Sequence, residues 1–177
     1  MRKLSHRVIT GSVMLAAQAT PEAIIGAVVG SMFPDIDIKL GIAHRTWTHW
    51  WPMYAIPLGV VGTMLHLGQF RSQAGIMMAT IAFWMMMGSI LHIVEDSLTV
   101  TGVPIVVPVT SPFEMNGVPW ISVNKRFSLR LTHTGGLLEY GIMAISVAIA
   151  WWVVVHNPAY KDLLMGWPHS FAERLGV

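Results

Sequence analysis

The sequence contains no cysteine and few charged residues. Without cysteine the chain has no disulfide and no thiolate ligand, so any metal site must use imidazole and carboxylate groups. Charged residues make up 11% of the chain, against about 25% in an average soluble domain, whereas hydrophobic residues make up 54%. The net charge of +2 is small and the basic residues are scattered, which is unlike a nucleic-acid-binding surface. This composition predicts an integral membrane protein and disfavours a soluble protein with unusually apolar helices.

Apolar segments organise the 177 residues into a single predicted membrane domain. Three segments approach the ~20 residues that a helix needs to cross a bilayer, and we predict spans over 51–69, 74–98 and 135–156. Residues 99–134 are rich in Pro, Gly and β-branched residues, and we expect a long ordered loop with short strands there. The expected fold is an all-α integral membrane protein, a small helical bundle in membrane lipid with about three to four transmembrane helices.

Residues 1–33 permit three interpretations. The basic start, the short apolar run and a small-residue motif resemble a cleaved signal peptide. Alternatively, two short helices, interrupted before Pro21, form either a hairpin or one straight first span. A hairpin brings His6 to the same side as Asp35, whereas a straight span separates them by about 40 Å. The hairpin also places most Lys and Arg residues beside the polar motifs, which predicts a cytoplasmic site, and we prefer it.

The first polar motif lies in residues 34–50, directly after an apolar helix. It contains two carboxylates two positions apart, Asp35 and Asp37, and two histidines five positions apart, His44 and His49. Carboxylates this close repel each other unless a cation or a hydrogen-bond donor lies between them. A helix stop with capping carboxylates would explain the first pair alone, and an interfacial location would explain the second. Together the pairs predict a metal-binding loop.

The second polar motif lies at the end of the helix predicted over 74–98. His92 and Asp96 are four positions apart and share one helical face, and Glu95 leans toward that face. Ionisable residues in a membrane helix are costly and usually face a polar interior, although they can also emerge into the headgroups. Because the segment 51–69 crosses the membrane and the next helix returns, we expect both motifs at the same membrane face.

These donors predict a divalent metal, with Zn²⁺ preferred over Mn²⁺ or Fe²⁺, in a site of one or two ions. Such an ion activates water for hydrolysis. Glu95 and Asp37 are candidates for a general base, and Arg45 for binding a phosphate or an anionic lipid headgroup. His6 joins the site only in the hairpin, and Glu139 is either a ligand or a favourable charge at a helix N-terminus. The predicted metal ligands are Asp35, Asp37, His44, His49, His92, Asp96, His6 and Glu139.

The motifs FPDID, HRTWTH and GSILHIVEDSLTVTGVPIVVP resemble those of the YdjM-like bacterial inner-membrane proteins, labelled LexA-regulated, membrane-bound, metal-dependent hydrolases. The resemblance covers about Pro34 to Pro108. An HxxxD element similar to that of zinc-dependent phospholipase C enzymes implies phosphoester substrates, in a lipid or another membrane-associated molecule. Trp50 departs from the family by standing where Ser is frequent. The resemblance implies that the metal-site residues are Asp35, Asp37, His44, His49, His92 and Asp96.

We therefore predict a metal-dependent phosphoester hydrolase in the bacterial inner membrane, with its site on the cytoplasmic side. Glu95 is a candidate base, and Arg45 or Lys125 would stabilise the negative charge of the phosphate. Two alternatives use the same ligands: a non-catalytic scaffold held together by the metal, and a metal sensor or transporter. Residues 76–87 are almost wholly apolar, which counts against a transport path along this helix. The sequence leaves the substrate and the oligomeric state open.

Overall fold

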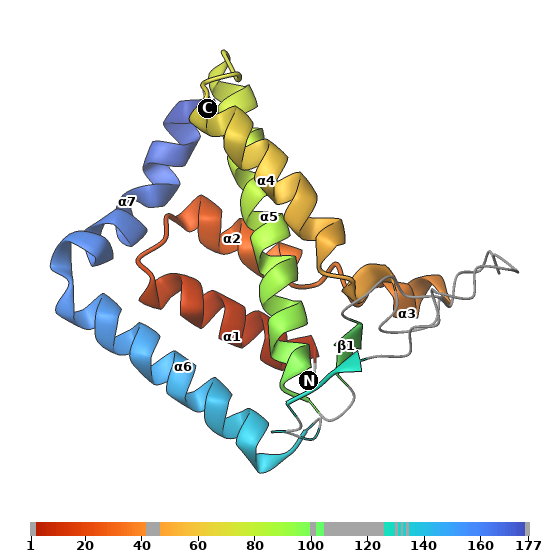
Figure 1. Cartoon of the computed structure of the whole chain (residues 1–177). Coiled ribbons are helices and arrows are strands. Elements are labelled where there is room, and N and C mark those ends of the chain that lie inside the picture. The colour runs from red at the N-terminus through yellow and green to blue at the C-terminus, as the bar shows by residue number, and fades with distance from the viewer. Residues whose placement is uncertain are drawn as a thin grey trace, which may run out of the picture.

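Helices make up most of the described chain (Figure 1). The computed structural model describes residues 3–41, 47–99, 102–104, 126–129, 131, 133 and 135–175. Its helices are α1 (Lys3–Ala16), α2 (Pro21–Gly30), α3 (Ile36–Leu40), α4 (Pro52–His66), α5 (Gln73–Ser97), α6 (Leu137–His156) and α7 (Pro158–Leu175), and a 3₁₀ turn, η1 (Trp47–His49), precedes α4. Two short strands, β1 (Val103–Pro104) and β2 (Arg126–Phe127), pair antiparallel. The prediction of an all-α fold is confirmed.

Two helices of the described chain, α5 and α6, are long and apolar enough to cross a membrane. The span predicted over 51–69 corresponds to α4, whose 15 residues reach about 22 Å, short of the ~30 Å hydrocarbon core. The helix ends early because the chain turns at Gly68, which has a φ of 63°. The expectation of three to four spans therefore exceeds what the described residues provide.

The N-terminal residues form a helical hairpin. Gln18 takes a positive φ of 55° between α1 and α2 and turns the chain back. Pro21 then opens α2, where its missing N–H costs nothing because the first helical turn has no acceptor for it. His6 near the start of α1 and Ser31 at the end of α2 both contact the last turns of α5. The hairpin thus brings both of its ends to the polar end of α5.

Packing places the helices in the order α4, α5, α2, α1 and α6. In Figure 1, α5 runs through the molecule with the α1–α2 hairpin beside it, and α6 and α7 follow on the left. The residues after Asn157 form a helix, α7. The Tyr160 hydroxyl donates a hydrogen bond of 2.8 Å to the carbonyl of Ala19, which ties α7 to the turn of the hairpin.

The crossing of α2 and α5 is so close that only glycine fits there. A Cβ on Gly30 would lie 1.9 Å from the carbonyl oxygen of Met85, and one on Gly88 would lie 1.9 Å from that of Ala27. Small residues let helix backbones approach in this way in membrane bundles. The Ser89 hydroxyl adds a hydrogen bond of 2.8 Å to the carbonyl of Gly30. This crossing fixes the end of α2 next to the last turns of α5.

The largest buried side chains of this protein are mainly polar, and many of its large apolar side chains are exposed. Large apolar side chains on α6 are mostly exposed, including Ile145 at 61% and Trp151 at 65%, whereas those on α5 are mostly half-buried, with Met78 exposed at 63%. Apolar surface of this extent is unfavourable in water but suits lipid. In the described chain, the largest fully buried side chains are mainly polar or charged and include His6, His49, His92, Glu139, Thr10, Thr99, Asp37 and Asp96.

Candidate metal centre

Two histidines and two aspartates converge at the last turns of α5. Nε2 of His49 lies 3.4 Å from Oδ2 of Asp96 and 3.8 Å from Oδ1 of Asp35. Nε2 of His92 lies 3.7 Å and 3.6 Å from the same two oxygens. These separations exceed ordinary hydrogen bonds of about 2.7–3.2 Å. They are close to the about 3.3–3.4 Å between donors that share a tetrahedral ion with bonds of about 2.0–2.1 Å. We call Asp35, His49, His92 and Asp96 the donor cluster.

The ring of His92 is oriented with its lone pair toward the donor cluster. Its Nδ1 lies 2.7 Å from the carbonyl oxygen of Ser31. A carbonyl only accepts, so Nδ1 carries the proton and Nε2 of the neutral ring presents a lone pair. Nε2 makes no hydrogen bond to any described residue. A lone pair that faces the oxygens of Asp35 and Asp96 is repulsive unless a cation lies between them, so this geometry fits a metal ligand.

The ring of His49 is oriented in the same way by a hydroxyl group. Oγ1 of Thr48 donates to Oδ2 of Asp37 over 2.6 Å, because a carboxylate only accepts. Having used its proton, the same oxygen accepts from Nδ1–H of His49, 3.2 Å away. Nε2 of His49 therefore presents its lone pair to the donor cluster. Asp37, predicted as a ligand, lies 3.5 Å from Nδ1 of His49 and supports that ring from behind.

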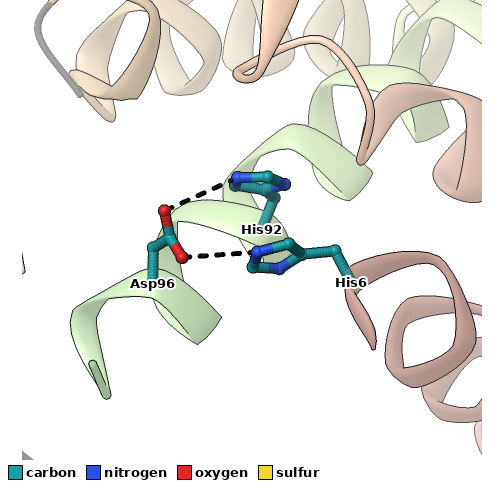
Figure 2. A group of neighbouring side chains, drawn as sticks. All are labelled: His6, His92 and Asp96. Carbon is teal, nitrogen blue, oxygen red and sulfur yellow. Dashed lines mark ion pairs between the residues drawn. The ribbon is translucent and has the colours of Figure 1, made fainter. Parts of the chain in front are cut away.

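His6 lies beside the donor cluster, next to both His92 and Asp96. Its Nε2 lies 3.3 Å from Oδ1 of Asp96, and its ring stacks on His92 with centroids 3.7 Å apart. Figure 2 shows the carboxylate of Asp96 with one oxygen directed to each ring. His6, His92 and Asp96 form a second group whose donor atoms lie close enough to hold an ion. Asp96 is thus placed to bridge two positions.

Glu95 contacts two residues of α1, and one of them, His6, lies between Glu95 and the carboxylate of Asp96. Its Oε2 lies 2.7 Å from Nδ1 of His6, and its Oε1 accepts a hydrogen bond of 3.3 Å from the Thr10 hydroxyl. The predicted general base therefore lies behind His6 and is 7% exposed. Both nitrogens of His6 face carboxylates, which allows the ring to carry a positive charge that offsets part of the buried negative charge.

Glu139 anchors α6 to α1. Its carboxylate accepts hydrogen bonds from the Ser5 hydroxyl and, over 2.7 Å, from the N–H of Gly135. The position matches a favourable charge at a helix N-terminus, and in the described chain Glu139 does not belong to the groups that could hold a metal. Because Ser5 precedes His6, this hydrogen bond also fixes the part of α1 that carries His6.

Several predicted residues, namely His44, Arg45 and Lys125, lie outside the described residues. Conversely, the sequence prediction missed the carbonyl of Ser31, which has no sequence signal because any residue supplies one. It also missed Thr10, for which a signal exists: Thr10 is four positions from His6 and shares its face of α1.

The chain belongs to the YdjM inner membrane protein family, whose family model matches residues 1–160. The matched region includes the hairpin, the donor cluster and both helices of membrane-spanning length. The resemblance inferred from the sequence motifs is therefore confirmed. Neither the curated proteins nor the solved structures contain a match to this chain. Membership of an inner membrane protein family agrees with the exposed apolar surfaces of α5 and α6.

Proposed function

We propose that this protein is a metal-dependent hydrolase of phosphoesters at the inner membrane. The observation that carries the proposal is the donor cluster, in which two imidazole lone pairs face two carboxylate oxygens at 3.4–3.8 Å. Hydrogen bonds to the far nitrogens of both rings hold them in the metal-binding tautomer. Burying charged and polar groups costs free energy unless they are paired or coordinate a metal ion, so this cluster is typical of a metal site.

The donor set suits a transition metal. Two imidazole nitrogens and two carboxylate oxygens favour Zn²⁺, Mn²⁺ or Fe²⁺ over an all-oxygen cage for Ca²⁺ or Mg²⁺. Asp35, His49, His92 and Asp96 would hold the ion, and His6 with Oδ1 of Asp96 offers a second position. When bound, a divalent ion polarises a phosphoryl oxygen and lowers the pKa of water.

His6 and Glu95 supply a pair that can move a proton beside the donor cluster. Glu95 holds Nδ1–H of His6 at 2.7 Å, which directs Nε2 toward Asp96. An imidazole held this way can take a proton at Nε2 and return it, and its carboxylate partner stabilises the charged ring. With a single ion in the donor cluster, we therefore assign the acid–base role to Nε2 of His6 and a positioning role to Glu95; a second ion would occupy this nitrogen instead.

A non-catalytic scaffold is the second candidate, and one observation favours it. Four protein donors can complete a tetrahedral shell, as in structural zinc sites, whereas catalytic sites keep one position for water. Asp35 is the most accessible of these donors: its side chain is 13% exposed and lines a cavity. A hydrolase requires that substrate or water reaches the ion from the side of Asp35.

Metal analysis and turnover measured on the same preparation distinguish the two candidates. Detergent-purified full-length protein is stripped with a chelator, reloaded with Zn²⁺ or Mn²⁺ and assayed with bis-p-nitrophenyl phosphate. Hydrolysis that disappears on stripping and returns on reloading is the expected result. Glu95→Gln should keep its metal and lose about 10²-fold or more of the turnover, because general acid–base catalysis contributes at least that much. Tightly bound metal without any turnover would favour the scaffold.

A further inference from the structure

A cavity of about 230 Å³ opens beside the donor cluster, and Asp35 forms part of its wall. It lies between the start of α1, the end of α2 and the short helix α3. Its volume is below the about 300–1,000 Å³ of a pocket for a drug-sized ligand. The cavity therefore suits a small group, such as one headgroup, rather than a whole lipid molecule.

The charged lining of this cavity is mainly basic. Lys3, Arg7 and Lys39 surround it, and the single carboxylate among its described lining residues, Asp35, directs Oδ1 toward the rings of the donor cluster. Nε of Arg7 is buried and makes no hydrogen bond to any described residue. A buried guanidinium nitrogen needs an acceptor, and guanidinium groups bind phosphate oxygens well. The charged groups of the lining therefore favour binding of an anion.

The remaining wall and rim of the cavity are apolar and exposed. Met32, Phe33 and Ile36 line it and are 42%, 40% and 41% exposed. The apolar surface continues along α3 to Ile38 and Leu40, which are 48% and 63% exposed. Basic residues next to exposed apolar residues are the pattern of a surface that meets anionic lipid headgroups. An ion such as inorganic phosphate would use the basic residues but leave the apolar rim in water.

We infer that this cavity binds the phosphate of an anionic membrane lipid, with the acyl chains outside on the apolar rim. The inference rests on the proposed hydrolase function and names its substrate class, a phosphoester whose alcohol is a membrane lipid. Lys3, Arg7 and Lys39 bind the phosphate oxygens, and the phosphate lies next to Asp35, the residue that the cavity shares with the donor cluster.

Lipid binding is measured on the detergent-purified full-length protein in EDTA, so that neither metal nor turnover enters the result. The probe is dioleoyl phosphatidic acid, compared with dioleoyl phosphatidylcholine and with inorganic phosphate. We expect phosphatidic acid to bind at least about tenfold more tightly than either, because each basic residue adds to the attraction. The double variant Lys3→Gln/Lys39→Gln should weaken its binding about tenfold or more.

The control variant, Arg71→Gln/Lys161→Gln, loses the same charge from exposed positions outside the cavity lining and should bind phosphatidic acid like the natural protein. Equal weakening in both double variants would overturn the inference, and so would equal binding of the two lipids. Inorganic phosphate that competes as well as phosphatidic acid would identify a free anion as the ligand and overturn the lipid assignment. If the double variant fails to fold, Arg7→Gln provides the same comparison.

A protein that binds phosphatidic acid through these residues but hydrolyses no phosphoester would refute the proposed function and leave the lipid site standing.

Discussion

Oδ1 of Asp35 lies 3.6 Å from Nε2 of His92, although Asp35 precedes the short helix α3 and His92 belongs to the membrane helix α5. The contact depends on Gly30 and Gly88, which allow α2 to cross α5 with its backbone nearly touching. That crossing also delivers the carbonyl of Ser31 to Nδ1 of His92 and so orients the ring. One helix crossing therefore determines both the position and the tautomer of His92, a candidate metal ligand.

Asp96→Asn should release most of the bound metal. The amide keeps the shape of the side chain but removes the negative charge that faces His49 and His92. We expect the affinity for Zn²⁺ to fall by more than the about 10–100-fold that the loss of a supporting partner costs. Elemental analysis after dialysis against a buffered chelator measures this. Asp162→Asn makes the same chemical change at an exposed position of α7 and should retain the metal. Unchanged metal content in Asp96→Asn would mean that Asp96 is not a metal ligand.

Thr48→Val should weaken metal binding without removing a ligand. The substitution keeps the volume of the side chain but breaks the hydroxyl link between Asp37 and His49. We expect about 10–100-fold lower Zn²⁺ affinity, and Thr48→Ser should restore it because the hydroxyl returns. Thr63→Val is the matched control, since its hydroxyl only bonds within α4. Equal metal affinity in the two valine variants would mean that the hydroxyl does not orient the ring.

Gly88→Ala should destabilise the fold. A Cβ at this position would lie 1.9 Å from the carbonyl oxygen of Ala27, so α2 and α5 must separate. Overpacking costs about 1–3 kcal/mol of unfolding free energy, which exceeds the up to about 1 kcal/mol that alanine gains over glycine in a helix. Gly141→Ala meets no atom within 4 Å and should be neutral or stabilising. Thermal unfolding in detergent compares them, and equal midpoints would contradict the close crossing.

Cysteine labelling can test the sidedness of the site, because the natural chain contains no cysteine. Lys39→Cys lies near the donor cluster and Arg71→Cys lies before the other end of α5, and both positions are exposed. The 25 residues of α5 separate these ends by about 37 Å. With a cytoplasmic site, a membrane-impermeant maleimide added to spheroplasts should label only Arg71→Cys. The reverse pattern would place the site on the periplasmic side, and labelling of both variants would argue against α5 as a span.

Local sequence patterns predicted the helical nature of the chain and the candidate donors. The spacing of His92 and Asp96 is a property of one helix, so it could be read without the fold. The number of spans was overestimated, because the apolar segment predicted over 51–69 forms a helix of only 15 residues, which ends where the chain turns at Gly68. The donor roles of Asp35 and Asp37 could not be separated, since both occur in the same short motif and their directions depend on how the chain turns into α3.

Composition, run length and helical spacing are local properties, so they were enough to predict a helical, apolar chain whose candidate metal donors are histidine and carboxylate. The fold selects which of these groups face one another. It placed Asp35 in the donor cluster, Asp37 behind His49, and Glu95 behind His6. These choices follow from how α1, α2 and α5 cross, and a crossing is set by the fit of surfaces distant in sequence, which no short pattern specifies.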